Sequence, residues 1–269
     1  MYNTIILSYV TFGYFFAFFS YLIMMVMKKD IFGYIGSFIV SITLFFHTLG
    51  IIIRWIESHK LGIGHAPLSN LYESLIFFGW AIMMLYIILE YRTKIRIFGA
   101  FVTPIAFLIM AYASFSPSVS TRIQPLIPAL KSNWLIAHVI TCFMGYAAFG
   151  ISMALSIMYL LNQKNHLAHM LEELNYQMII IGFLMLTLGI ITGSVWAHYA
   201  WGSYWSWDPK ETWSLITWLI YAALIHSRMV RGWRGKRIAI LSIIGFSCVL
   251  FTYLGVNFLL SGLHSYAKS

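Results

Sequence analysis

Residues 5–27 read IILSYVTFGYFFAFFSYLIMMVM, a run without a charged side chain. A helix needs about 20 predominantly apolar residues to cross the hydrocarbon core of a bilayer, and this run meets that length. The run is too long for the apolar part of a signal peptide, and no cleavage site follows it. We therefore expect it to be retained as a membrane span.

Similar apolar runs recur along the whole chain. Charged residues make up 9% of the 269 residues and hydrophobic ones 61%, which leaves too little charge to cover a water-soluble domain. We expect an all-α, polytopic integral membrane protein with about eight transmembrane helices, forming a single integral membrane domain over residues 1–269. The predicted spans are 5–27, 33–53, 73–90, 95–113, 134–161, 178–197, 212–230 and 237–259.

The basic residues predict the orientation of the chain, because the loops of a membrane protein on the cytoplasmic side are enriched in Lys and Arg. Eleven lie on one side of the predicted spans and six on the other, so the first side is expected to be cytoplasmic. Both termini and the longer loops at 54–72, 114–133 and 198–211 are then outside. The scatter of these charges over short loops also argues against a nucleic-acid partner. The eleven are Lys28, Lys29, Arg92, Lys94, Arg96, Lys164, Arg228, Arg231, Arg234, Lys236 and Arg237, and the six are Arg54, Lys60, Arg122, Lys131, Lys210 and Lys268.

Several classes of function lack their sequence signals. Cys142 and Cys248 lie inside predicted spans and form no CxxC pair, which argues against a disulfide-built domain or a thiol reductant. The sequence also contains no GxxxxGK[ST], GxGxxG, HExxH or GxSxG motif. Nothing therefore indicates a nucleotide site, a zinc protease or a hydrolase triad.

The strongest local signal is the stretch 196–213, which reads WAHYAWGSYWSWDPKETW. Five tryptophans within eighteen residues far exceed the aromatic belt of an ordinary membrane interface. Gly202 and Ser203 leave room for a planar ligand between the rings. This segment, about 196–218 with its continuation, is the candidate binding segment.

The end of this stretch is typical of a helix start. Asp208 is expected to be the N-cap, Pro209 the first helical residue, and Glu211 a carboxylate near the positive end of the helix dipole. The free N–H groups of that first turn, together with Lys210, could meet a carboxylate of a ligand, such as a haem propionate.

The stretch WGSYWSWDPKETW, 201–213, resembles the WWD signature of the superfamily of haem-handling membrane proteins. Its continuation is similar to the System II branch of cytochrome c biogenesis proteins, the CcsA (ResC) type. The resemblance covers most of the chain from about Arg54. The other matching stretches are LITWLIY at 215–221, LIHSR at 224–228, SNWLIAHV at 132–139, GLHSY at 262–266, RW at 54–55 and PLSNLYESL at 67–75.

This resemblance implies a function in System II cytochrome c maturation. Such a protein conveys or holds haem b (protohaem) and presents it on the outer face of a bacterial cytoplasmic or thylakoid-type membrane for thioether attachment to CxxCH apocytochromes. The resemblance also implies a partner of the CcsB (ResB) type and a thiol-reducing partner. The chain is then part of a holocytochrome c synthase complex rather than an enzyme with its own acid–base site.

The resemblance also implies the ligands of the haem. His138 and His264 match the two histidines that flank the WWD segment and ligate the external haem; both are expected at the level of the Trp-rich loop, and two histidines can bind iron from opposite faces. His226 lies within a predicted span, where an ionisable residue indicates function, and matches the histidine of a second haem in the membrane. Depth argues against His47 as its second ligand, and a histidine of the partner is expected instead. The cradle of the external haem is expected from Trp201, Trp205, Trp207, Asp208 and Trp213.

The remaining candidates have simpler interpretations. His198 stands where the family pattern has another residue, and the expectation for His59 and His65 is that they are exposed polar residues. Arg54, at the predicted outer end of a span, is either an interfacial anchor or a partner of Glu73 or of a propionate. His166 and His169, near Glu172 and Glu173, are expected on a solvated turn, and Cys142 as a small buried thiol. The alternatives for the whole chain are a transporter or channel whose vestibule the tryptophans line, and a scaffold for a partner.

Overall fold

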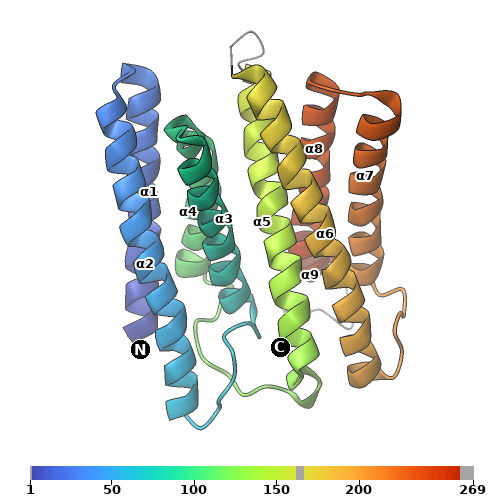
Figure 1. Cartoon of the computed structure of the whole chain (residues 1–269). Coiled ribbons are helices and arrows are strands. Elements are labelled where there is room, and N and C mark those ends of the chain that lie inside the picture. The colour runs from blue at the N-terminus through green and yellow to red at the C-terminus, as the bar shows by residue number, and fades with distance from the viewer. Residues whose placement is uncertain (1, 162–166, 261–269) are drawn as a thin grey trace. The chain divides into compact units, whose positions relative to one another are not determined.

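The computed structural model of the chain describes residues 2–161 and 167–260. All secondary structure in these residues is helical, which confirms the predicted fold class (Figure 1). The chain divides into two compact units, Met1–Ile127 and Pro128–Ser269. We describe each unit by itself, and a single domain over the whole chain stays a prediction.

The first unit is a set of four long helices. Helix α1 packs along α2 and α4, while α3 packs against α4 and α2. The close approach of α1 to α2 depends on Gly13, because a Cβ there would lie 2.3 Å from Oγ1 of Thr43. The elements are α1 (Tyr2–Met27), α2 (Asp30–Lys60), α3 (Leu71–Thr93), η1 (Arg96–Phe98) and α4 (Gly99–Phe115).

The second unit is built on the long pair α5 and α6, drawn in yellow-green and gold in Figure 1. Helix α8 packs on α5, and α7 packs on α8 and α6. In its core the rings of Phe149 and Tyr221 stack with centroids 3.5 Å apart, and Gly182 leaves the space that the Phe149 ring occupies. The elements are η2 (Pro128–Leu130), α5 (Asn133–Leu161), α6 (Ala168–Trp201), α7 (Pro209–Arg231), α8 (Lys236–Leu250), the π-helical turn η3 (Phe251–Gly255) and α9 (Val256–Leu259).

Seven helical stretches in the described part of the chain are long and apolar enough to cross a membrane, so the chain is a membrane protein. They are α1, α2, α3, Arg96–Phe115, α5, α6 and the continuous stretch Lys236–Leu259. The remaining predicted span, 212–230, is also a helix, α7, but it does not reach the same apolar character. Polar and aromatic residues such as Thr217, Trp218 and His226 interrupt its apolar sequence.

Two helices extend well beyond the predicted spans. Helix α2 continues to Lys60 instead of ending near residue 53, and α6 begins at Ala168 instead of residue 178. The criterion of 20 apolar residues finds the hydrocarbon-crossing part of a helix and not its end. The predicted span end at Arg54 is therefore wrong, and of the alternatives for this residue the interfacial anchor is excluded, because Arg54 lies inside α2 and its side chain is buried.

Candidate functional site

The tryptophan-rich segment begins at the last turn of α6. That helix ends at Trp201, and Gly202 follows in the left-handed conformation with φ of 81°, where its N–H donates to the carbonyl oxygen of His198 at 2.9 Å. Such a C-cap is the usual place for glycine, because a side chain is disfavoured at positive φ. A Cβ on Gly202 would meet no atom within 4 Å, so the helix end opens onto free space.

The segment ends in a capping box at the start of α7. The side chain of Asp208 accepts a hydrogen bond from the N–H of Lys210 at 2.9 Å, and the Glu211 carboxylate accepts from the N–H of Asp208 at 3.2 Å. The same carboxylate accepts from the N–H of Ser206 at 2.7 Å. The predicted helix start is thus correct. The structure also gives Glu211 a role that the sequence analysis missed, since this buried carboxylate holds the loop in place.

Between these two helix ends, aromatic rings are presented outward. The side chain of Trp207 is 68% exposed and that of Tyr204 57%, and the ring of Tyr204 stacks on His198 with centroids 4.3 Å apart. Trp205 is half-buried against the edge of Trp207, and its indole nitrogen is buried without a hydrogen-bond partner. Large exposed aromatic rings with a buried unused donor are typical of a binding surface.

Trp207 also has an unusual backbone. Its φ is 58°, a conformation that a bulky residue adopts only under strain. Strained residues of this kind are concentrated at binding sites, where the surrounding structure holds them. Here the surrounding structure is the capping box, whose N-cap Asp208 follows directly.

His138 lies on α5 against the last turns of α6. Its ring is nearly parallel to that of Trp196, with centroids 6.0 Å apart, and Trp196 in turn contacts the edge of Trp201 at 4.7 Å. Nδ1 of His138 lies 2.7 Å from the carbonyl oxygen of Gly189. A carbonyl oxygen can only accept, so Nδ1 carries the proton and Nε2 carries the lone pair. The structure therefore brings His138 and the start of the tryptophan-rich segment together.

Lys210 is a cation at the same helix start. It is half-buried, and burial lowers the pKa of its ammonium group to about 8, although Asp208 and Cys142 both act to raise it. Cys142 itself lies next to His138, with Sγ 3.6 Å from Nδ1. A partly desolvated cation at a helix N-terminus favours an incoming carboxylate.

Trp213 belongs to the packing of the second unit more than to the exposed surface. Its ring lies 4.2 Å from that of Phe251, the first residue of the π-helical turn. Its carbonyl oxygen accepts hydrogen bonds from Thr217 at 2.8 Å and from Thr252 at 3.3 Å. Trp213 therefore ties the start of α7 to the π-helical turn η3, and its contact with haem stays a prediction.

His226 faces outward from α7. The buried face of this helix includes Thr217, Tyr221 and Leu224, whereas His226 is exposed. His226 lies nine residues after Thr217, which at 3.6 residues per turn is about half a turn around the helix. A partner for this imidazole within α5, α6 or α8 is thus not supported. His264 lies outside the described residues, so its convergence with His138 stays a prediction.

The polar residues at the ends of α2 and α3 form a closed network in the first unit. Arg54 donates to Glu73 at 2.8 Å and to the carbonyl oxygens of Thr121 at 3.0 Å and Arg122 at 3.4 Å, and both charged side chains are 1% exposed. Of the alternatives for Arg54, its pairing with Glu73 is confirmed.

His65 was expected to be exposed, which is wrong: it is buried, and its ring nitrogens lie 2.9 and 3.0 Å from the carbonyl oxygens of Ala66 and Gln124.

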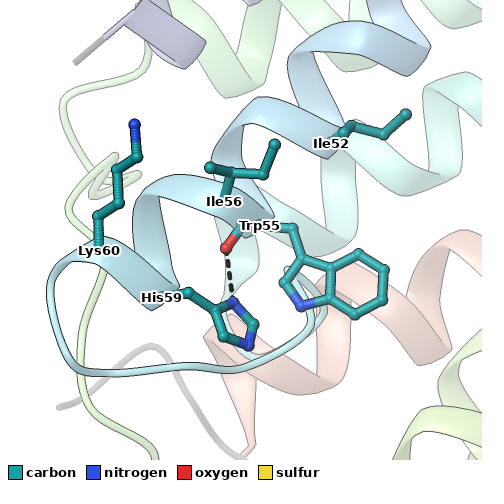
Figure 2. Close-up of a pocket in the computed structure, with 5 residues that line it drawn as sticks. All are labelled: Ile52, Trp55, Ile56, His59 and Lys60. Carbon is teal, nitrogen blue, oxygen red and sulfur yellow. Dashed lines mark hydrogen bonds between the residues drawn. The ribbon is translucent and has the colours of Figure 1, made fainter.

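A hollow on the surface of α2 is a weaker candidate. Figure 2 shows that all five of its lining residues come from the last turns of this one helix. Nδ1 of His59 lies 2.9 Å from the carbonyl oxygen of Trp55, a residue of the same helix. The hollow gathers no second element and no buried charge, and His59 is exposed as expected. The hollow is lined by Ile52, Trp55, Ile56, His59 and Lys60.

The other candidates have structural roles. His47 is buried in the first unit, with Nδ1 3.0 Å from the hydroxyl of Tyr14. Arg228 bonds both Glu172 and Glu173, at 3.1 and 2.6 Å, so these carboxylates stabilise the packing of α6 on α7. His169 is exposed beside them, whereas His166 lies outside the described residues.

The fold and the site together define a helical membrane protein that presents aromatic rings between two helix ends, with an oriented histidine at the base of the segment. The model of the cytochrome C assembly protein family matches residues 68–264. This chain belongs to that family, and its function is in cytochrome c biogenesis.

Curated relatives agree over most of the chain. The cytochrome c biogenesis protein CcsA of Guillardia theta is 42% identical over 92% of this chain and 90% of its own length. The CcsA proteins of Mesostigma viride and Prochlorococcus marinus are 41% and 43% identical, covering 89% and 80% of this chain and 88% and 78% of their own lengths.

A solved structure shares the fold. The cytochrome c haem lyase CcmF superimposes with a TM-score of 0.73 at 16% sequence identity. The match covers 94% of this chain but only 46% of CcmF, so this chain spans less than half of that protein.

Proposed function

We propose that this chain holds haem b at its tryptophan-rich segment, on the outer side of a bacterial cytoplasmic or thylakoid-type membrane, and presents it for attachment to apocytochrome c. The observation that carries the proposal is the placement of His138. Its Nδ1 is committed to the Gly189 carbonyl, so Nε2 has the lone pair that binds iron. Its ring lies beside Trp196, at the start of the segment.

The exposed rings supply the surface for the flat macrocycle. Trp207 and Tyr204 present exposed rings between the two helix ends, and Gly202 leaves open space at the end of α6. Aromatic faces stack on extended planar ligands with offset geometry. In this proposal Trp201, Trp205 and Trp207 contact the porphyrin, with Asp208 and Trp213 fixing the loop that carries them.

The start of α7 supplies the site for a haem propionate. Its first-turn N–H groups and Lys210 offer positive charge in a partly desolvated place, which stabilises a carboxylate. The capping box holds this turn rigid, since Asp208 and Glu211 are both buried.

Attachment of haem requires that the thiol and the vinyl group be positioned together more than it requires an acid or a base. Each cysteine thiol of a CxxCH segment adds across one vinyl group: a C–S bond forms, the vinyl double bond becomes a single bond, and the thiol hydrogen passes to the neighbouring vinyl carbon. The addition is redox-neutral. The chain would hold the vinyl edge open to the acceptor and keep the two groups in contact.

The two other histidines extend the proposal. His264 would be the second histidine that holds the iron of this haem. His226 would ligate a second haem within the membrane, and its outward direction fits a second ligand from a partner of the CcsB type rather than from this unit. A thiol-reducing partner would keep the acceptor cysteines reduced.

The test replaces the ligand directly. In His138→Ala the purified protein should lose the absorption bands of bound haem and cells should lose cytochrome c maturation, while added imidazole restores both in part. His59→Ala is the matched control, since His59 is an exposed histidine of the first unit, and it should leave both unchanged. Normal haem spectra in His138→Ala would refute the ligand assignment.

A further inference from the structure

A stripe on one face of α6 encloses the ring of His138. Gly189, Gly193 and Trp196 follow one another at spacings of four and three residues, which places them on the same side of the helix. Gly189 contacts the histidine through its carbonyl oxygen, and Trp196 lies beside it with its ring. Gly193 has no side chain and so leaves the space that the imidazole occupies. We refer to these three residues as the α6 slot.

The carbonyl oxygen of Gly189 fixes the tautomer. Nδ1 of His138 donates to it at 2.7 Å, and the hydroxyl of Thr192 donates to the same oxygen at 3.2 Å. A helix carbonyl is within reach of a neighbouring side chain only where no bulky residue covers it. A Cβ on Gly189 would lie 2.5 Å from Sγ of Cys142, so this glycine also allows α5 to approach.

Gly193 leaves the space for the ring itself. A Cβ at this position would lie 2.5 Å from Nδ1 of His138 and 2.7 Å from Cε1. Real Cβ atoms essentially never come this close to another atom, so any side chain at residue 193 must displace the ring. Because Nδ1 and the Gly189 oxygen are already at hydrogen-bond distance, a displaced ring loses that hydrogen bond.

Trp196 lies beside the ring and nearly parallel to it. It is 1% exposed, its plane lies 18° from that of His138, and its indole N–H donates to the carbonyl oxygen of Ala129 at 2.8 Å. The ring thus lies against the backbone of α6 and beside an anchored indole.

We infer that Gly189, Gly193 and Trp196 are positioning residues for His138: the α6 slot fixes the ring orientation and the Nδ1–H tautomer, so that Nε2 is the nitrogen presented to a ligand. The use of that nitrogen to bind haem iron rests on the proposed function, whereas the tautomer does not. Residues that orient a metal-ligating histidine in this way typically contribute 10- to 100-fold to affinity or activity.

The first experiment is done on the haem-free full-length protein in nanodiscs. Nitrogen NMR of ¹⁵N-histidine-labelled protein should give His138 as a single Nδ1–H tautomer, identified by the loss of its signal in His138→Ala. In Gly193→Ala the signal should shift to a mixture of tautomers, while the neighbouring Ser194→Ala should leave it unchanged. A retained single Nδ1–H tautomer in Gly193→Ala would overturn the inference.

The second experiment measures haem affinity and keeps the two proposals separate. Gly193→Ala should weaken haem binding by about 10- to 100-fold. The residual haem affinity of His138→Ala, measured by titration with excess haem, should not fall further when Gly193→Ala is added, because the slot acts through His138. If the tautomer responds to Gly193→Ala but His138→Ala binds haem normally, the proposed function fails and the slot stands. An equal loss of affinity in both backgrounds would show a general packing defect and would overturn the inference.

Discussion

Two polar regions of the molecule use their hydrogen-bonding groups in opposite ways. In the first unit, Arg54 and Glu73 are both 1% exposed, and their contacts are made with Asn3, Ser69 and loop carbonyls of the same unit. In the second unit, the capping box is closed, yet it carries a loop whose Trp207 is 68% exposed and whose Trp205 has an unused buried donor. The difference separates a region whose polar groups are all used within the fold from one that leaves aromatic rings exposed, as the proposed haem site requires.

The largest effect is expected where the closed network is broken. Arg54→Met leaves the Glu73 carboxylate buried without its partner, and such a loss typically costs about 3–5 kcal/mol of the free energy of unfolding. Denaturant unfolding in detergent, followed by tryptophan fluorescence, measures it. The double variant Arg54→Met, Glu73→Gln should recover part of the loss, because no uncompensated charge remains. Equal stability of the single variant and wild type would show that the network is not structural.

Two helix caps, one in each unit, should differ in their effect on haem binding. Asp208 caps α7 and Asn70 caps α3, each through a hydrogen bond of 2.9 Å to a backbone N–H. Either residue changed to Ala should lose roughly 0.5–2 kcal/mol of stability. Only Asp208→Ala should also weaken haem binding, because only α7 begins at the tryptophan-rich segment. A similar loss of haem in Asn70→Ala would remove the distinction between the two regions.

A smaller effect is expected for single exposed rings. Trp207→Leu should raise the dissociation constant for haem by roughly two- to ten-fold, the range of an aromatic stacking contact. Stability should change by less than about 0.5 kcal/mol, as for most surface substitutions. Trp55→Leu is the control, since Trp55 is an exposed tryptophan of the first unit. Haem titration followed by visible absorption measures both, and equal effects would contradict the assignment of the loop.

The sequence predicted the helical class, the helix start at Asp208 and Pro209, and the aromatic loop, because each depends on local composition. It could not predict the direction of His226. The spacing of Thr217, Tyr221 and Leu224 marks one face of α7, but which face is buried depends on α5, α6 and α8. The α6 slot was missed for the same reason. The spacing of Gly189 and Gly193 can be read from the sequence, but the sequence does not show that His138 of another helix packs against them.

The smallest effect at neutral pH is expected from Lys210. Its pKa of about 8 in the haem-free protein, lowered from the ordinary 10.5 by burial, should rise when a propionate binds beside it. Haem binding then takes up a proton above pH 8, and affinity falls as the pH rises, by about four-fold between pH 7 and pH 8.5.

Haem titration across pH 7 to 9.5 measures this dependence. Lys210→Arg should keep the affinity constant over the same range, because a guanidinium stays charged throughout. Lys210→Met should bind haem more weakly at pH 7 and also show no dependence. A wild-type affinity that does not change between pH 7 and pH 9.5 would place the propionates away from Lys210, and the start of α7 would then be, like the network around Arg54, a region that serves the fold alone.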